Sequence, residues 1–208
     1  MIKENWKIYT NWLKTKLPKY AALLNSGASV GDIEKLENYL QFAVPDDLKI
    51  LLLTNNGDSK LNSENSFLGA FLGFEFLSVD RIISVHEDWK NYVMNEYDGT
   101  SFPVNHIKIA YTNPKWIPIF ADSAGNYVGL DLDPDLDGVS GQIINFGRDE
   151  ENKFVIAKNL NSFLEFVVGK INSGECDAAI TEEEEGEYSY GLNAQSHLID
   201  DLREIFGG

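Results

Sequence analysis

The fold is decided by residues 116–146, which read WIPIFADSAGNYVGLDLDPDLDGVSGQIINF. Apolar runs rich in Ile, Val, Leu and Phe alternate here with turn-forming Asp, Ser, Asn and Gly, a pattern typical of strands joined by short turns. The connections are too short to hold crossover helices, so the sheet should be largely antiparallel. Together with runs on either side, the pattern predicts strands at 107–111, 117–121, 127–132, 142–146 and 154–157.

Helical spacing of apolar residues flanks this run of strands on both sides. It predicts a first helix with Ile2, Trp6, Tyr9 and Leu13 on one face. Further helices are predicted after the capping pair Ser29 and Asp32, after Pro45, after Ser78 (with Ile82, Ile83, Trp89 and Val93), and over 160–171. The predicted class is therefore α+β: N-terminal helices, a central mostly antiparallel sheet with one inserted helix, and a C-terminal helix.

Acidic charge is concentrated at the C-terminal end. The 208 residues include 33 acidic and 17 basic ones, a formal net charge of −16. Residues 171–208 hold ten of the acidic residues and one basic residue, Arg203. We therefore predict a main domain over 1–172, followed over 173–208 by an acidic linker and a short amphipathic helix. Its apolar face would hold Leu198, Leu202, Ile205 and Phe206, with Asn193 or Ser196 as its cap.

Composition excludes several classes of protein. A 43% hydrophobic content is enough for a sizeable core and excludes wholesale disorder. No apolar stretch approaches the roughly 18 residues of a membrane span, and the first residues lack the apolar region of a signal peptide. A charge of −16 opposes nucleic-acid binding, and a single cysteine, Cys176, excludes a disulfide framework. We expect a cytoplasmic protein that binds neither nucleic acid nor membrane.

One acidic turn has the opening pattern of a calcium loop. Asp133, Asp135 and Asp137 occupy positions 1, 3 and 5 of an EF-hand loop, and Gly138 occupies the bend position. Position 12, where calcium requires a bidentate carboxylate, is Ile144. An acidic turn between two strands explains the same residues, so no metal ligand is predicted here.

Residues for catalysis are scattered along the chain. His86, His106 and His197 show no metal-ligand spacing and no nucleophile motif, and His86 falls close to the apolar face of a predicted helix. Cys176 lies in an acidic segment, which disfavours the reactive thiolate. We predict no catalytic residue and no cofactor.

Two features are candidates for partner binding. Trp116 lies between two prolines and just before the strand predicted at 117–121, where a tryptophan is either a buried anchor or an exposed binding residue. The run 182–185 consists of four glutamates and is either a solvated linker or an attractor for a basic partner.

Short motifs follow one another in a specific order and spacing over about residues 20–170. They are GAS at 27–29, IxxLE at 33–37, VPDDLK at 44–49, NNG at 55–57, LGFEFLS at 72–78, WIPI at 116–119, DxxGN at 122–126, LDLDP at 130–134 and GxxGQII at 138–144. In this order they resemble the Smi/Knr branch of the SUKH superfamily. The resemblance implies an α+β fold and a strand-turn-strand role for the acidic turn, and it does not cover the tail.

What the resemblance implies about function is a binding domain without enzyme activity. Bacterial members are largely immunity proteins that neutralise a cognate toxin, often a nuclease, whereas fungal members regulate cell-wall synthesis and morphogenesis. We predict an immunity protein for a polymorphic or contact-dependent toxin, because one compact domain without long disordered arms favours the bacterial role. The attraction of an acidic protein to the basic cleft of a nuclease adds modest weight. The alternatives are a regulatory scaffold of the fungal kind and a calcium- or small-ligand-binding protein. The predicted partner contacts are Trp116, Asp131, Asp133, Glu182, Glu183, Glu184 and Glu185.

Overall fold

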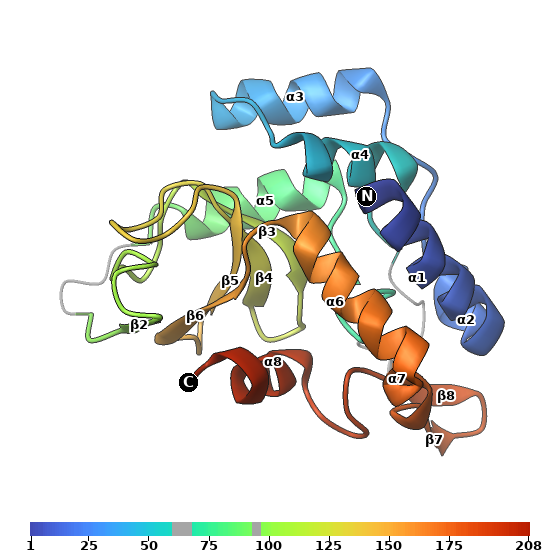
Figure 1. The fold of residues 1–208 in the computed structure, drawn as a ribbon. Helices are drawn as coiled ribbons and strands as arrows, with labels where there is room; N and C mark the ends of the chain where they lie inside the picture. Colours follow the sequence, from blue (N-terminus) through green and yellow to red (C-terminus); the bar gives the residue numbers. More distant parts are fainter. Residues whose placement is uncertain (60–67, 93–96) are drawn as a thin grey trace.

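The computed structural model describes residues 1–59, 68–92 and 97–208 and has the predicted α+β architecture (Figure 1). Its helices are α1 (Ile2–Lys16), α2 (Pro18–Ala21), α3 (Val30–Leu40), α4 (Asp46–Thr54), α5 (Val79–Trp89), α6 (Leu160–Ser173), α7 (Glu175–Ala178) and α8 (Leu198–Phe206). Its strands are β1 (Glu75–Phe76), β2 (Thr100–Phe102), β3 (Trp116–Ala121), β4 (Asn126–Asp131), β5 (Gln142–Gly147), β6 (Asn152–Ala157), β7 (Thr181–Glu184) and β8 (Glu187–Ser189).

The central sheet has the order β1-β3-β4-β5-β6-β2. The β3–β4, β4–β5 and β5–β6 pairs are antiparallel, as their short connections predict, and β2 is parallel to β6. The strand predicted at 107–111 was wrong, since this segment pairs with no strand in the part of the chain that is described. Its apolar pattern has another cause, because Ile107 is buried in the core while Ile109 is exposed on a loop.

The N-terminal caps of α3 and α5 are the residues predicted from the sequence. Ser29 accepts a hydrogen bond from the Asp32 amide, and Asp32 in turn accepts from the Ser29 amide, so α3 begins with the predicted capping box. Ser78 caps α5 through the amide of Arg81. Val93, expected on the same helix face, lies outside the described residues.

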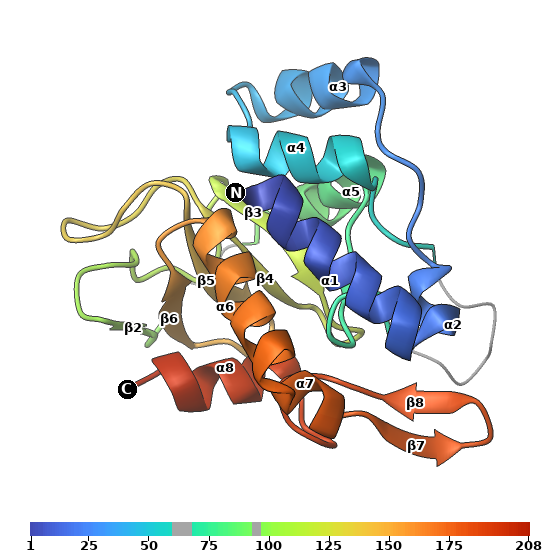
Figure 2. The same cartoon turned by 45° about the vertical axis from the view of Figure 1, so that its right-hand side comes forward.

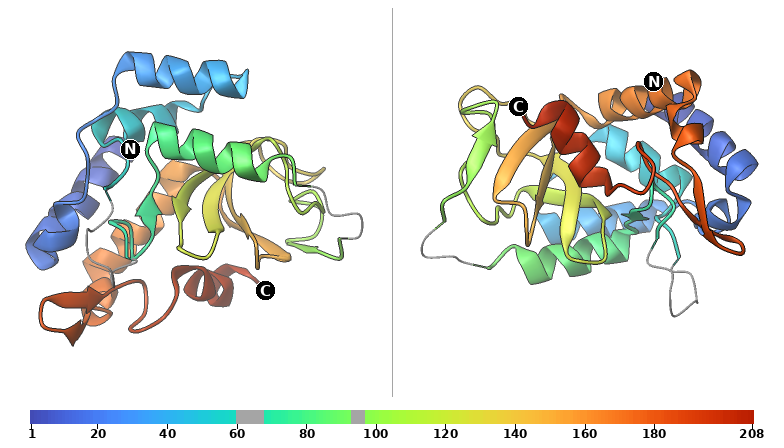
Figure 3. Two further views of the ribbon diagram at one scale, coloured as in Figure 1. Left: turned by 180° about the vertical axis from the view of Figure 1, so that it is seen from behind. Right: turned by 90° about the horizontal axis from the view of Figure 1, so that it is seen from below.

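Alternation along the strands gives the sheet two apolar faces. Val128, Ile143, Phe154 and Ile156 face the main core, which includes buried residues of α1 and α6. Phe120 stacks on Phe71 with ring centroids 3.7 Å apart at the centre of this core. The opposite face carries a smaller core made of Ile107, Trp116, Ile144 and Phe146, against which Trp89 of α5 packs. Figure 1 shows α6 in front of the sheet, and the view from behind shows α5 on the other side (Figure 3).

The C-terminal segment folds onto the rest of the chain. Where we expected an acidic linker, the structure has α7 and a β7–β8 hairpin that projects beside α2 (Figure 2). The Tyr20 hydroxyl anchors this hairpin by accepting from the Tyr188 amide (3.1 Å) and donating to its carbonyl (2.8 Å). The apolar residues Leu198, Ile199 and Leu202 of α8 are fully buried in the main core. The predicted amphipathic helix is therefore present, but the prediction of its cap was wrong, since its N-cap is His197 and not Asn193 or Ser196. Ile205, predicted on its apolar face, is exposed. The division at residue 172 stays a prediction.

Two polar contacts hold α8 against the sheet. Arg203 makes an ion pair with Glu150, in which the single nitrogen Nη2 lies 2.9 Å from both carboxylate oxygens. Glu150 is buried and also accepts a hydrogen bond from Asn145. His197 Nε2 lies 3.2 Å from Asp122 in the β3–β4 turn. The tail therefore neutralises a buried carboxylate of the main domain.

Replacing Arg203 with Met should destabilise the protein, because Glu150 would stay buried with Asn145 as its remaining side-chain partner. The arginine side chain is 39% exposed, so solvent screens part of the pair, and we expect a loss of about 2 kcal/mol rather than the roughly 3–5 kcal/mol of a fully buried pair. Denaturant unfolding measures the loss. The control is Arg148→Met at an exposed position, and equal stability of the two variants would refute the role of the pair.

The His197–Asp122 pair should make stability depend on pH. The hydrogen bond to Asp122 raises the pKa of His197. Burial raises the pKa of Asp122, but hydrogen bonds from His197 and from the Asn126 and Ala124 amides outweigh it and lower this pKa to about 2. Because the folded-state pKa of His197 is raised, its contribution is complete below the unfolded pKa of about 6.5 and is lost as pH rises through the folded value.

The test compares wild type with His197→Gln by thermal unfolding from pH 5 to 9. Relative to the variant, wild type should lose about 0.5–1 kcal/mol as pH rises, since the histidine is partly exposed and the pair is screened. A constant difference between the two proteins across this range would contradict the assignment. Taking the difference cancels the titration of other groups with shifted pKa values, such as Asp58 (raised to about 7) and Lys153 (lowered to about 8).

Candidate functional site

Trp116 and Asp131, two of the predicted contact residues, lie beneath the surface. They are direct partners in the β3–β4 register, and both are fully buried. Trp116 packs in the smaller core, with its ring centroid 5.6 Å from that of Phe146. The prediction that these two side chains contact a partner was therefore wrong, because neither side chain has exposed surface. They instead support the neighbouring loops: Trp116 packs with Ile107, and Asp131 accepts a hydrogen bond from the Asp133 amide.

Asp131 and Gln142 form a buried polar pair at the ends of β4 and β5. The Asp131 carboxylate accepts from Gln142 Nε2 (2.9 Å) and from the Asp133 amide (2.9 Å). Burial raises the pKa of Asp131, and these hydrogen bonds act in the opposite direction. Gln142 Nε2 also donates to the His106 carbonyl (2.8 Å), while its Oε1 accepts from the Val139 amide (3.1 Å). One buried side chain thus links two loops.

We call residues 102–109 and 132–141 the paired loops. The amide of Asp135 donates to the His106 carbonyl at 3.2 Å, and the amide of Asp137 donates to the Asn105 carbonyl at 3.0 Å. A Cβ added to Gly138 would lie 2.1 Å from the His106 oxygen, so the close approach requires glycine. These contacts hold the loops in one arrangement.

Large apolar side chains project from the paired loops into solvent. Leu136 is 89% exposed and Val104 is 72% exposed, and Phe102, Ile109 and Val139 are exposed as well. A concentration of exposed apolar groups marks a binding surface more often than scattered single residues do. These residues were not predicted from the sequence, although a leucine between Asp135 and Asp137 in an otherwise polar turn was a visible signal.

Asp133, the third predicted contact, lies at the edge of the paired loops. Its carboxylate pairs with Lys108 Nζ (2.6 Å) and accepts from Asn113 (3.0 Å). The hydrogen bond from Lys108 lowers the pKa of Asp133. Among residues 1–59, 68–92 and 97–208, no group of three or more histidine, cysteine or acidic side chains is arranged to hold a metal ion.

The four glutamates of the predicted acidic attractor lie elsewhere. Glu182, Glu183 and Glu184 belong to β7 and Glu185 to its turn, and all four are exposed. Figure 1 shows the hairpin and the paired loops at opposite ends of the molecule. The predicted contact residues therefore fall into two separate places rather than one site.

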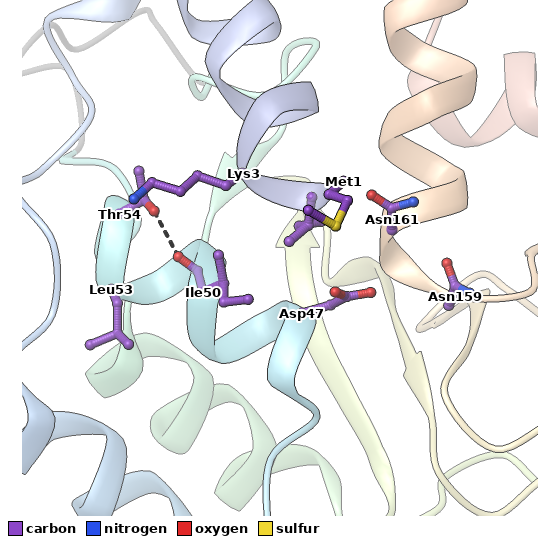
Figure 4. Close-up of a pocket in the computed structure, with 9 residues that line it drawn as sticks. Met1, Lys3, Asp47, Ile50, Leu53, Thr54, Asn159 and Asn161 are labelled. Atoms are coloured by element: carbon purple, nitrogen blue, oxygen red, sulfur yellow. Dashed lines mark hydrogen bonds between the residues drawn. The ribbon is translucent and has the colours of Figure 1, made fainter.

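Two hollows lie elsewhere on the surface of the molecule. A groove of about 620 Å³ lies between α1, α4 and the start of α6, with Ile50 and Leu53 on one wall and Asn159 and Asn161 on the other (Figure 4). A second hollow of about 530 Å³ lies where the tail meets the 68–74 loop, with Glu183 and His197 in its lining. Lys3 and Asp47 give the groove one charge of each sign, so its charge favours no class of ligand.

Residues with catalytic potential are engaged in structural contacts. His86 Nε2 donates to the Pro114 carbonyl (2.8 Å), which only accepts, and Nδ1 faces the Tyr39 hydroxyl (3.0 Å). Burial lowers the pKa of His86, so the imidazole is neutral. Cys176 is buried, which raises the pKa of its thiol to about 12 and keeps it protonated.

In the described part of the chain no helix is long and apolar enough to cross a membrane.

Replacing Gln142 with Leu should loosen the paired loops. The change removes hydrogen bonds to Asp131, His106 and Val139 and leaves buried polar groups without partners, which costs about 1–3 kcal/mol. Hydrogen exchange at the amides of Asp135 and Asp137 should become faster. Ser140→Ala at an exposed position in the same loop is the control, and unchanged exchange in Gln142→Leu would disprove the link.

Comparison with known proteins gives one family. Residues 27–165 match the model of the SMI1 / KNR4 family (SUKH-1). The chain is 28% identical to the cell wall assembly regulator SMI1 of Saccharomyces cerevisiae, with 81% of this chain and 40% of the relative covered. It is 27% identical to the cell wall biosynthesis/cell cycle regulator smi1 of Schizosaccharomyces pombe, covering 84% of this chain and 37% of the relative. It is 26% identical to the glucan synthesis regulatory protein of Neurospora crassa, covering 83% of this chain and 39% of the relative.

These relatives correct the functional prediction. The prediction of a toxin-immunity protein, with a nuclease toxin as its partner, was wrong, because the relatives are fungal regulators of cell-wall and glucan synthesis. The chain spans about 40% of the length of the relatives it matches. The matched range includes both paired loops and ends before the tail. The chain belongs to the SMI1 / KNR4 family (SUKH-1).

Proposed function

We propose that this chain is a regulatory module of cell-wall synthesis that acts by binding other proteins and catalyses no reaction itself. The observation that carries the proposal is the similarity to regulators of cell-wall assembly and glucan synthesis, which extends over more than 80% of the chain in three fungal relatives. Residues 1–172 form the family domain in this proposal, and 173–208 are a supporting segment folded against it.

The physical support for a binding role comes from the paired loops. Their exposed apolar side chains stand on backbone that is fixed by hydrogen bonds and by the buried Gln142. A surface that is ordered before binding loses little conformational entropy when a partner contacts it. The engagement of His86 and Cys176 in the interior agrees with a role that does not depend on chemistry at these residues. We place this activity in the cytoplasm.

The proposal is tested by a chimera, because the chain covers only 40% of the Saccharomyces regulator. The matched segment of that regulator is replaced by this chain, and the chimera is expressed in cells that lack the regulator. We expect wall glucan content and growth in a wall-perturbing dye to return toward wild-type values. A chimera with Leu36→Asp is the control, because this substitution places a charge at a fully buried position and should abolish folding and rescue.

The result that contradicts the proposal is equally specific. The chimera would have to be present at the normal level, and limited proteolysis would have to show that it is folded. If such a chimera has no effect on wall glucan, this chain lacks the regulatory role.

A further inference from the structure

We infer that the paired loops dock a protein segment in which lysine or arginine side chains stand beside large apolar ones. This inference rests on the proposed function, because it takes the chain to be a protein-binding module and names the chemistry of its partner. The exposed apolar side chains Val104, Leu136 and Val139 stand on loops that are hydrogen-bonded to each other.

Acidic charge surrounds the exposed leucine of this surface. Leu136 lies between Asp135 and Asp137 in the sequence. Asp133 is neutralised by Lys108, whereas within the described residues Asp135 and Asp137 form no ion pair with any basic side chain. The most exposed apolar side chain of the loops therefore has two carboxylates beside it that a basic partner can pair with.

Charge favours a basic occupant over the other classes of occupant. Two copies of a chain with a charge of −16 repel each other, and an anionic lipid surface is repelled in the same way. A basic segment is attracted by the chain as a whole and by Asp135 and Asp137 locally. Its apolar side chains can cover Leu136 and Val104, which gives the contact its hydrophobic part.

Rigidity of the loops sets what kind of segment can bind. Gln142 and the amides of Asp135 and Asp137 fix the loops from below, so the partner segment has to adapt its own shape. Short flexible peptides with the right side chains are therefore suitable probes.

The test selects short random peptides displayed on phage against the complete chain. The enriched sequences are synthesised, and their affinity is measured by fluorescence anisotropy. We expect enrichment of lysine and arginine together with large apolar residues. Val104→Ser combined with Leu136→Ser should weaken binding about tenfold or more, since both substitutions remove apolar area from the contact. Both positions are exposed, so the variant should fold normally.

Matched variants separate the contributions. Asp135→Asn with Asp137→Asn should weaken binding several-fold and reduce its salt dependence. Val30→Ser with Leu53→Ser removes exposed apolar side chains on α3 and α4, including one that lines the groove, and should leave binding unchanged. Loss of binding in this control alone would assign the site to the groove and overturn the inference.

Other outcomes also overturn it. These are enrichment of acidic peptides, failure to enrich any peptide, and equal binding by wild type and the Val104→Ser, Leu136→Ser variant. Concentration-dependent dimers in sedimentation that this variant abolishes would show that the occupant is a second copy.

The chimera separates this inference from the proposed function. If the loops bind basic apolar peptides but the chimera does not restore wall glucan, the regulatory role fails and the docking surface stands. If a chimera with Val104→Ser and Leu136→Ser restores the wall as well as the unmodified one, the regulatory role stands and the docking surface fails.

Discussion

The hydrogen bond between buried Gln142 and buried Asp131 is the contact on which the exposed surface depends. It joins the ends of β4 and β5 at the point where a long turn leaves the sheet, and it leaves the second donor of the amide free for the His106 carbonyl. A buried carboxylate without such a donor would carry a large desolvation cost. The two side chains satisfy each other's hydrogen-bonding groups, and Gln142 also bonds to both paired loops. Two buried residues therefore determine the shape of an exposed surface to which neither belongs.

The tail illustrates how a strongly acidic segment can still fold. Its glutamates project from an exposed hairpin strand, where water solvates them, while Tyr188 and Tyr190 fix the hairpin through hydrogen bonds to Tyr20 and to the Gly69 carbonyl. The single basic residue of the tail, Arg203, is the one that pairs with a buried carboxylate of the domain. Acidic composition suggested a linker, whereas the two tyrosines, Arg203 and the buried apolar side chains of α8 fix the segment on the domain.

Local sequence pattern was sufficient to predict individual helices and strands, but not to predict which of them pack or pair with each other. Alternating apolar residues and short turns predict β3, β4 and β5, and the capping box predicts the start of α3, because both signals lie within a few residues of sequence. The parallel pairing of β2 with β6 joins segments about fifty residues apart, and no local pattern encodes it. Trp116 and Asp131 were recognised as special residues, but the sequence does not reveal that Ile107 and the paired loops cover them.

Net charge is a weak guide to the partner of this chain, because it acts on any basic protein. Charges separated by more than about 8 Å are largely screened at physiological salt, so the glutamate hairpin, at the opposite end of the molecule from the paired loops, influences the rate of encounter more than the stability of a complex there. Selectivity has to come from groups within contact distance. On this molecule the apolar Leu136 and Val104, with Asp135 and Asp137 beside them, meet that requirement, and a partner's identity is therefore read at the loops rather than from the charge of the chain.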